Sequence, residues 1–270
     1  MVHGPSRTSL AEAQDALAAR VDEPGFEVLS AELLDVSALL SRESSLRGVL
    51  SDAGTPSERR ASLASAVLQG LVSELTRDVV ADVVRSRWSS ARDLVDALEV
   101  LGAEAAFLGA ERSGRLDAVE DELFRFARTI AGDDRLASTL SDPAVADSAK
   151  AELVAGLLRG RAQDETVRLV SHVVAHPRGR GAESAVTELV ELAARRREEL
   201  VAEVTAADRV TEEQQRRLAA ALGRVYGRTV TLQVAIDPTV LGGVVVRVGD
   251  EVIDGSVAHR LAEARRRLGV

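Results

Sequence analysis

Apolar side chains recur every three or four residues along most of the first 200 positions, which is the spacing that places them on one face of an α-helix. A clear example is the run Phe26, Leu29, Leu33, Val36 and Leu40. The pattern stops at 54–56, the sequence Gly-Thr-Pro, because proline cannot continue a helix, and it resumes afterwards. Residues from about 9 to 200 are therefore predicted to form helices joined by short breaks.

The helical pattern repeats with an offset of 90 positions. Leu33 recurs as Leu123, the triplet Leu50-Ser51-Asp52 as Leu140-Ser141-Asp142, and Gly70, Thr76 and Val80 as Gly160, Thr166 and Val170. Helical periodicity does not require matching polar residues and glycines, so these matches favour a duplication over chance similarity between two Ala/Leu-rich stretches. We predict two tandem antiparallel helical bundles, at residues 1–92 and 93–199. Because no proline lies between Ser89 and Gly114, the last helix of the first copy is predicted to run into the first helix of the second.

After Leu200 the apolar period changes from 3.6 to 2, which is typical of strands. Thr211-Glu212-Glu213-Gln214 has the pattern of a capping box and predicts a helix start. Alternation over 229–236 and a hairpin at 244–253 predict three further strands, and Asp254-Gly255-Ser256 offers the N-cap of a last helix. The fold class is therefore predicted as mainly α, with the two bundles followed by a small α/β domain, β-α-β-β-β-α, at residues 200–270.

Composition narrows the classes of function. The formal net charge is −9, which argues against a nucleic-acid partner bound through its phosphates. The chain has no cysteine, so disulfides and thiolate chemistry are excluded. No stretch approaches the roughly 18–20 apolar residues of a membrane span, so we expect no direct membrane insertion.

Two short patterns resemble sites but are incomplete. His172 and His176 have the i, i+4 spacing of paired zinc ligands, yet Val173 stands where the zincin motif has glutamate, and no third ligand is near in sequence. Gly179-Arg180-Gly181 resembles part of a dinucleotide fingerprint, but no strand precedes it and the third glycine is missing. We therefore predict no catalytic residue, no cofactor and no metal.

The most specific stretch of the sequence lies between Ile236 and Leu261. Gly242 and Gly243 allow backbone angles that a Cβ atom would forbid. The residues that carry a resemblance follow in fixed order: Asp237, Leu241-Gly242-Gly243, Arg247, Gly249-Asp250, Val252-Ile253-Asp254-Gly255-Ser256 and Arg260-Leu261. This run resembles the C-terminal signature of the delta subunit of F-type ATP synthases, the bacterial relative of the mitochondrial oligomycin-sensitivity-conferring protein.

The resemblance implies a non-catalytic subunit of the peripheral stalk, or stator. In this family a six-helix bundle binds the N-terminal helix of one α subunit on the catalytic head of α and β subunits. A smaller α/β domain binds the C-terminal region of the b subunit, so that the head resists rotor torque during proton-driven ATP synthesis. The expected location is the cytoplasmic face of the bacterial plasma membrane, as a peripheral protein. Residues 1–92 are then an additional bundle. The alternative is a helical adaptor unrelated to ATP synthase.

The resemblance also implies a groove for the α-subunit helix, between the first and fifth helices of a bundle. In the second copy the expected groove residues are Ala103, Ala105, Ala106, Leu169, His172 and Val173. Small side chains permit close helix approach, and positions spaced i, i+3 and i+4 share a helix face. Asp15 of the first copy corresponds to Ala105, and a carboxylate in an apolar groove is costly to desolvate, so the second bundle is expected to bind α. Gly102 stands where members of the family commonly have tyrosine.

Overall fold

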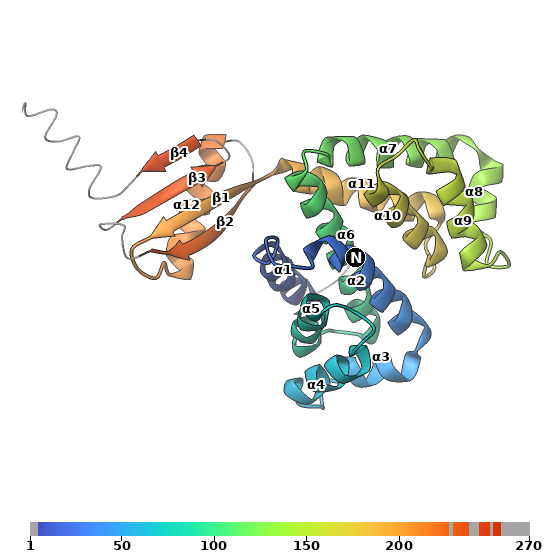
Figure 1. Cartoon of the computed structure of the whole chain (residues 1–270), viewed down its shortest axis with the longest axis horizontal. Coiled ribbons are helices and arrows are strands. Elements are labelled where there is room, and N and C mark those ends of the chain that lie inside the picture. The colour runs from blue at the N-terminus through green and yellow to red at the C-terminus, as the bar shows by residue number, and fades with distance from the viewer. Residues whose placement is uncertain (1–4, 227–228, 238–242, 249–250, 255–270) are drawn as a thin grey trace, which may run out of the picture. The chain divides into compact units, whose positions relative to one another are not determined.

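The computed structural model describes residues 5–226, 229–237, 243–248 and 251–254, and Figure 1 shows their arrangement. The chain divides into two compact units, Met1–Ala194 and Arg195–Val270. The first unit is helical, and the second contains a four-stranded sheet. The predicted fold class, helical bundles followed by a small α/β domain, is confirmed. The last predicted helix, after Asp254, lies outside the described residues.

The helices of the first unit repeat with the same offset as the sequence. Following α1 (Pro5–Ala18), four helices of the first copy each begin and end 90 positions before a helix of the second copy. They are α2 (Phe26–Arg42) and α7 (Leu116–Gly132), α3 (Ser44–Ser51) and α8 (Asp134–Ser141), α4 (Ser57–Leu68) and α9 (Asp147–Leu158), and α5 (Glu74–Arg85) and α10 (Asp164–Ala175). Helix lengths and loop lengths are therefore the same in the two copies.

A polar contact inside each bundle repeats as well. Thr76 at the start of α5 donates its hydroxyl to Glu32 Oε2 of α2 at 2.5 Å. In the second copy, Thr166 at the start of α10 donates to Glu122 Oε2 of α7 at 2.6 Å. Both threonines are fully buried. Each contact fixes the start of the fifth helix against the second, because a buried hydroxyl needs a hydrogen-bond partner.

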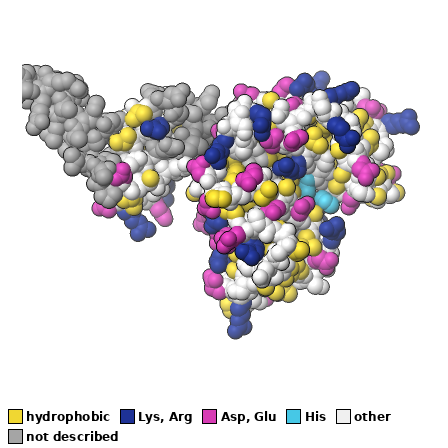
Figure 2. All heavy atoms as spheres, in the orientation of Figure 1, with side chains coloured by type: hydrophobic (Ala, Val, Ile, Leu, Met, Phe, Trp, Pro, Cys, Tyr) yellow, Lys and Arg dark blue, Asp and Glu magenta, His cyan; other side chains and the backbone are white. Residues whose placement is uncertain are grey.

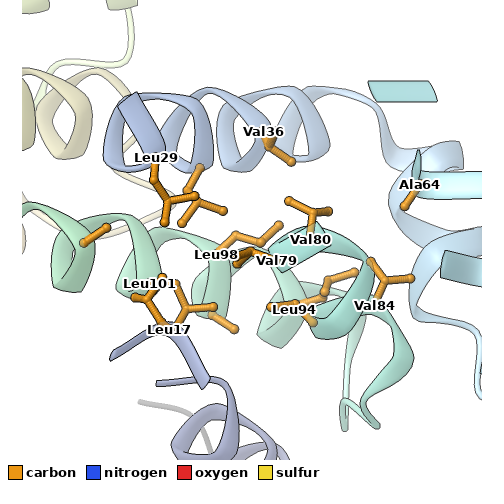
Figure 3. Packing of buried hydrophobic residues seen from close by; sticks show 14 of the residues in the cluster. Leu17, Leu29, Val36, Ala64, Val79, Val80, Val84, Leu94, Leu98 and Leu101 are labelled. Atoms are coloured by element: carbon orange, nitrogen blue, oxygen red, sulfur yellow. The ribbon is translucent and has the colours of Figure 1, made fainter. Parts of the chain in front are cut away.

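A single long helix, α6 (Ala91–Arg112), belongs to both bundles. Its residues Leu94, Leu98 and Leu101 pack into the core of the first bundle, as Figure 3 shows. Ala106 and Phe107 face the core of the second bundle, which α11 (Ala182–Glu198) completes. The prediction of a continuous helix across the junction is confirmed. Because both cores use the same rigid helix, the two bundles form one body.

The second unit is a mixed sheet with strand order β2-β1-β3-β4. Its elements are β1 (Glu199–Ala206), α12 (Glu212–Tyr226), β2 (Thr229–Ile236), β3 (Val244–Val248) and β4 (Glu251–Asp254). Strand β1 is parallel to β2 and antiparallel to β3, and its Val204 pairs with Val234 and Val246. This register brings apolar positions of three strands into one row, against which Leu222 of α12 packs.

The predicted capping box opens helix α12. The Thr211 amide donates to Gln214 Oε1 at 2.8 Å, and the Gln214 amide donates to Thr211 Oγ1 at 3.3 Å. Two backbone donors at the start of the helix are thereby satisfied reciprocally. The start of α12 could be predicted from the local sequence alone.

Candidate partner-binding surfaces

The six residues predicted to line a partner groove lie on α6 and α10, as expected. Five of them, Ala103, Ala105, Ala106, Leu169 and Val173, are at most 3% exposed. Ala105 belongs to the core of the first bundle, and the other four belong to the core of the second. The sixth residue is His172, whose side chain is 8% exposed. An incoming helix therefore meets no open surface at these positions.

Helix α2 of the first bundle covers α6 along the side of this predicted groove. Ser30 of α2 donates its hydroxyl to the backbone oxygen of Gly102 at 2.8 Å, and Ser37 donates to the oxygen of Val95 at 3.3 Å. A Cβ atom on Gly102 would lie 2.8 Å from Leu34 Cδ2, which is closer than such atoms approach. Gly102 therefore permits the close approach of α2 at this position, and a larger side chain would separate the two helices.

Leu34 continues this contact into the second bundle. Although it belongs to the first copy, Leu34 is 2% exposed and packs with the core residues of the second copy. Its neighbour Leu33 is fully buried in the core of the first copy. Helix α2 therefore has two buried faces, one for each bundle.

The start of α2 also borders the start of α10. A cavity of about 380 Å³ lies between α2, α6 and the first turn of α10. Its lining includes Phe26 and Ser30 of α2, Ala106 and Gly109 of α6, and Arg168 of α10. At the opposite end of α2, the positive charge of Arg42 contributes to lowering the pKa of His176, which follows the last residue of α10. Helix α2 therefore packs along α6, and its first turn borders the first turn of α10 across this cavity.

A buried group of charges holds α6 against the loop between α10 and α11. Glu99 Oε1 accepts from Arg180 Nη2 at 2.7 Å and is also paired with Arg178, which reaches Asp96 at 3.2 Å. Glu99 Oε2 lies 3.4 Å from His172 Nε2. Burial by itself raises the pKa of Glu99, but His172, Arg178 and Arg180 together outweigh burial and lower the pKa to about 2. Glu99 is therefore a carboxylate at neutral pH.

The loop that carries the two arginines has unusual backbone angles. Arg178 has φ 47° and the following Gly179 has φ 84°. A positive φ is costly for arginine, and the surrounding contacts must offset the cost. Here the ion pairs with Glu99 and Asp96 provide those contacts. The Gly-Arg-Gly sequence is a loop, as predicted, and it positions cations on a buried carboxylate.

The histidine pair does not assemble a metal site in the described part of the chain. The rings of His172 and His176 have centroids 4.9 Å apart, and His176 Nδ1 lies 3.8 Å from Asp147 Oδ2. Burial, followed by the neighbouring His172, lowers the pKa of His176. Among the described residues, no group of three or more His, Cys, Asp or Glu side chains could hold a metal ion. Figure 2 shows histidine side chains, in cyan, at the molecular surface.

The signature residues are described in part. Gly243 has φ 83° just before β3, so the predicted need for glycine at this turn is confirmed for that residue. The amide of Asp237 donates to the oxygen of Ala206 at 2.9 Å, which ties the end of β2 to the end of β1. Asp254 ends β4. Gly242, Gly249, Asp250, Gly255 and Ser256 lie outside the described residues.

Comparison with known proteins decides the family. The family model "ATP synthase delta (OSCP) subunit" matches residues 102–268. The chain belongs to this family. Curated relatives named "ATP synthase subunit delta" are similar over nearly the whole chain. The relative from Streptomyces coelicolor is 49% identical over 269 residues and is covered to 98% of its length. The relative from Nocardia farcinica is 44% identical over 270 residues and is covered to 100%.

The family model and the curated relatives differ in whether they include the first bundle. The family model begins at residue 102, so it covers most of the second bundle and the α/β unit but not the first bundle. The relative from Acidothermus cellulolyticus, 45% identical over 274 residues, matches 99% of the chain and therefore includes the first bundle too. The additional bundle is thus a shared feature of a group within the delta (OSCP) family.

The sequence contained signals for two features that were not predicted. Glu99 stands between Leu98 and Leu101 on a helix whose other inward positions are apolar, which indicates a buried carboxylate in need of a cation. The adjacent leucines Leu33 and Leu34 widen the apolar surface of their helix beyond the narrow stripe at Phe26, Leu29, Leu33, Val36 and Leu40, which is compatible with a second packing partner. The partners of both features come from distant segments, so local patterns could not identify them.

Proposed function

We propose that the chain is a non-catalytic link in the peripheral stalk of an F-type ATP synthase. The helical unit would hold the head by contacting the N-terminal helix of an α subunit, and the α/β unit would hold the C-terminal region of the b subunit. The observation that carries this proposal is the family match over residues 102–268, which spans both compact units. A stator must connect two partners, and a chain with two separate bodies offers one body to each.

Two structural features support a role under mechanical load. The long helix α6 is shared by both bundles, so a force on one bundle is transmitted to the other through a continuous backbone. The Glu99 ion pairs bind α6 to the loop before α11, the helix that leads toward the α/β unit. Close packing and shared helices resist deformation, because interiors have low compressibility.

The proposed location is the cytoplasmic face of the plasma membrane, at which the complex is anchored by other subunits. Among the described helices, none combines the length and the apolar character that crossing a bilayer requires. We propose that the chain reaches the membrane through the b subunit alone.

Affinity purification from detergent-solubilised membranes tests the proposal. A tagged full-length chain should bring down the α, β and b subunits in fixed proportion. A chain that ends at residue 194 should keep α and β and lose b, because the α/β unit is then missing. An eluate without these subunits would favour the alternative, a helical adaptor outside ATP synthase. Retention of b by the shortened chain would show that the two contacts were assigned to the wrong units.

A further inference from the structure

Helix α2 has the properties of a helix bound in a groove. Its side chains Ser30, Leu34 and Ser37, at i, i+4 and i+7, lie on one stripe that faces α6. Peptide helices that bind in grooves place their anchor residues at this same spacing. The two serine hydroxyls bond to backbone oxygens, and the leucine enters the core of the second bundle.

The groove accepts α2 because α6 has small residues where the helices cross. Gly102 faces Leu34, and Ala105 and Ala106 follow on the same helix. The corresponding helix of the first copy, α1, has Glu12 at the position of Gly102 and Asp15 at that of Ala105. Such side chains would hold a second helix away, so the close crossing is particular to α6.

The matching helix of the second copy lacks this contact. Phe124 of α7 corresponds to Leu34 of α2, yet it is 52% exposed. The two copies therefore share their internal folds while they differ in the outer face of the second helix. Burial of Leu34 is a property of how the first bundle meets the second and not a requirement of the bundle fold.

A cavity of about 380 Å³ remains near Gly109, at the start of α2. Beside it, the predicted groove residues Ala103, Ala106 and Leu169 are at most 3% exposed. A further helix therefore finds no open apolar surface at those positions.

We propose that α2 is the resident occupant of the groove between α6 and α10, and that it closes this groove to helices from other proteins. The proposal rests on the proposed function in one respect, since the excluded partner is the N-terminal helix of the α subunit. The additional bundle then has a defined task, which is to fill the groove and to fix both bundles as one body. A head contact must use a different surface of the helical unit.

Hydrogen exchange of the full-length chain, read by mass spectrometry, tests this proposal. Gly102→Ala places a Cβ atom against Leu34 and should raise the exchange rate of α2 amides by on the order of tenfold. Gly109→Ala is the matched control, because a Cβ atom there meets nothing within 4 Å, and it should leave α2 unchanged. Leu34→Val is a milder second variant that should shift α2 in the same direction. Equal exchange of α2 in Gly102→Ala and Gly109→Ala would overturn the proposal.

A second arm adds an excess of a synthetic peptide with the sequence of the α-subunit N-terminus. The proposal predicts that α2 amides of the unmodified chain exchange at the same rate with and without the peptide. Faster exchange of α2 in the presence of the peptide would show displacement and would overturn closure of the groove. A peptide that does not bind agrees with closure and counts against the proposed head contact, so the two proposals can fail separately.

Discussion

Replacement of Glu99 by glutamine should destabilise the helical unit at neutral pH. The side chain keeps its shape but loses its charge, while Arg178 and Arg180 remain beside it. A pKa of about 2, compared with the ordinary value of 4.5, corresponds to about 3 kcal/mol at 1.36 kcal/mol for each pKa unit. Removal of one member of a buried ion pair costs a similar amount, about 3–5 kcal/mol, because the remaining charge is left without its partner.

The sign of the pH dependence follows from the lowered pKa. The unfolded chain binds a proton at Glu99 near pH 4.5, whereas the folded chain binds it only near pH 2. The stabilisation is therefore complete well above pH 4.5 and is lost as the pH falls toward 2. The difference in stability between the unmodified chain and Glu99→Gln should be about 3 kcal/mol at pH 7 and less than half of that at pH 3.

Urea unfolding followed by fluorescence provides the assay. Trp88 is the only tryptophan of the chain, is 7% exposed, and packs in the core that α6 completes. Glu188→Gln is the control, because that carboxylate pairs with Arg180 at 2.6 Å but is 49% exposed, and exposed pairs contribute about 0–1 kcal/mol. An equal loss in both variants, or a Glu99→Gln difference that does not change between pH 7 and pH 3, would refute this account of the buried charges.

Three further substitutions probe the packing, the turn and the repeated polar contact. Leu34→Ala should destabilise the chain by about 2–5 kcal/mol in urea unfolding. Leu71→Ala, whose side chain is 69% exposed, should cost less than about 0.5 kcal/mol. Similar losses in the two variants would contradict burial of Leu34. Gly243→Val should cost about 1–3 kcal/mol and weaken b binding, because valine does not tolerate φ 83°, and unchanged melting and affinity would refute the strained turn. Thr166→Val should cost about 1–3 kcal/mol, because Glu122 loses the buried hydroxyl and keeps only the amide of Gln163 as a donor. A neutral result in thermal unfolding would argue against the contact.

Local and periodic features of the fold could be predicted from the sequence. The capping box at Thr211, the hairpin of β3 and β4 and the offset of 90 positions depend on neighbours in the chain or on repetition, and the structure contains all of them. Gly243 was recognised because a glycine pair before a β-branched run indicates a special backbone angle, and its φ of 83° agrees. These features required no knowledge of distant contacts.

The surface of the helical unit could not be predicted in the same way. Periodicity places Ala105 and Leu169 on inward faces, but it does not tell which helix covers them. Their side of the bundle was predicted to bind a partner, whereas α2 of the same chain packs there against α6. From the sequence, Gly102 indicated only that the tyrosine common in the family is missing. In the structure, Leu34 of α2 packs against this position and leaves no room for a larger side chain. Binding of the α-subunit helix in this groove stays a prediction from the family resemblance, and closure of the groove by α2 is the competing proposal.

The central claim is that one covalent chain connects the head to the membrane-bound part of the synthase, and membrane vesicles stripped of this subunit test it most directly. Adding back the full-length chain should return the head to the vesicles and restore ATP synthesis driven by a proton gradient. Adding residues 1–194 and residues 195–270 together as separate pieces should restore neither, although each piece should occupy its own partner. Restoration by the two unlinked pieces, or failure of the intact chain to rebind the head, would contradict the claim.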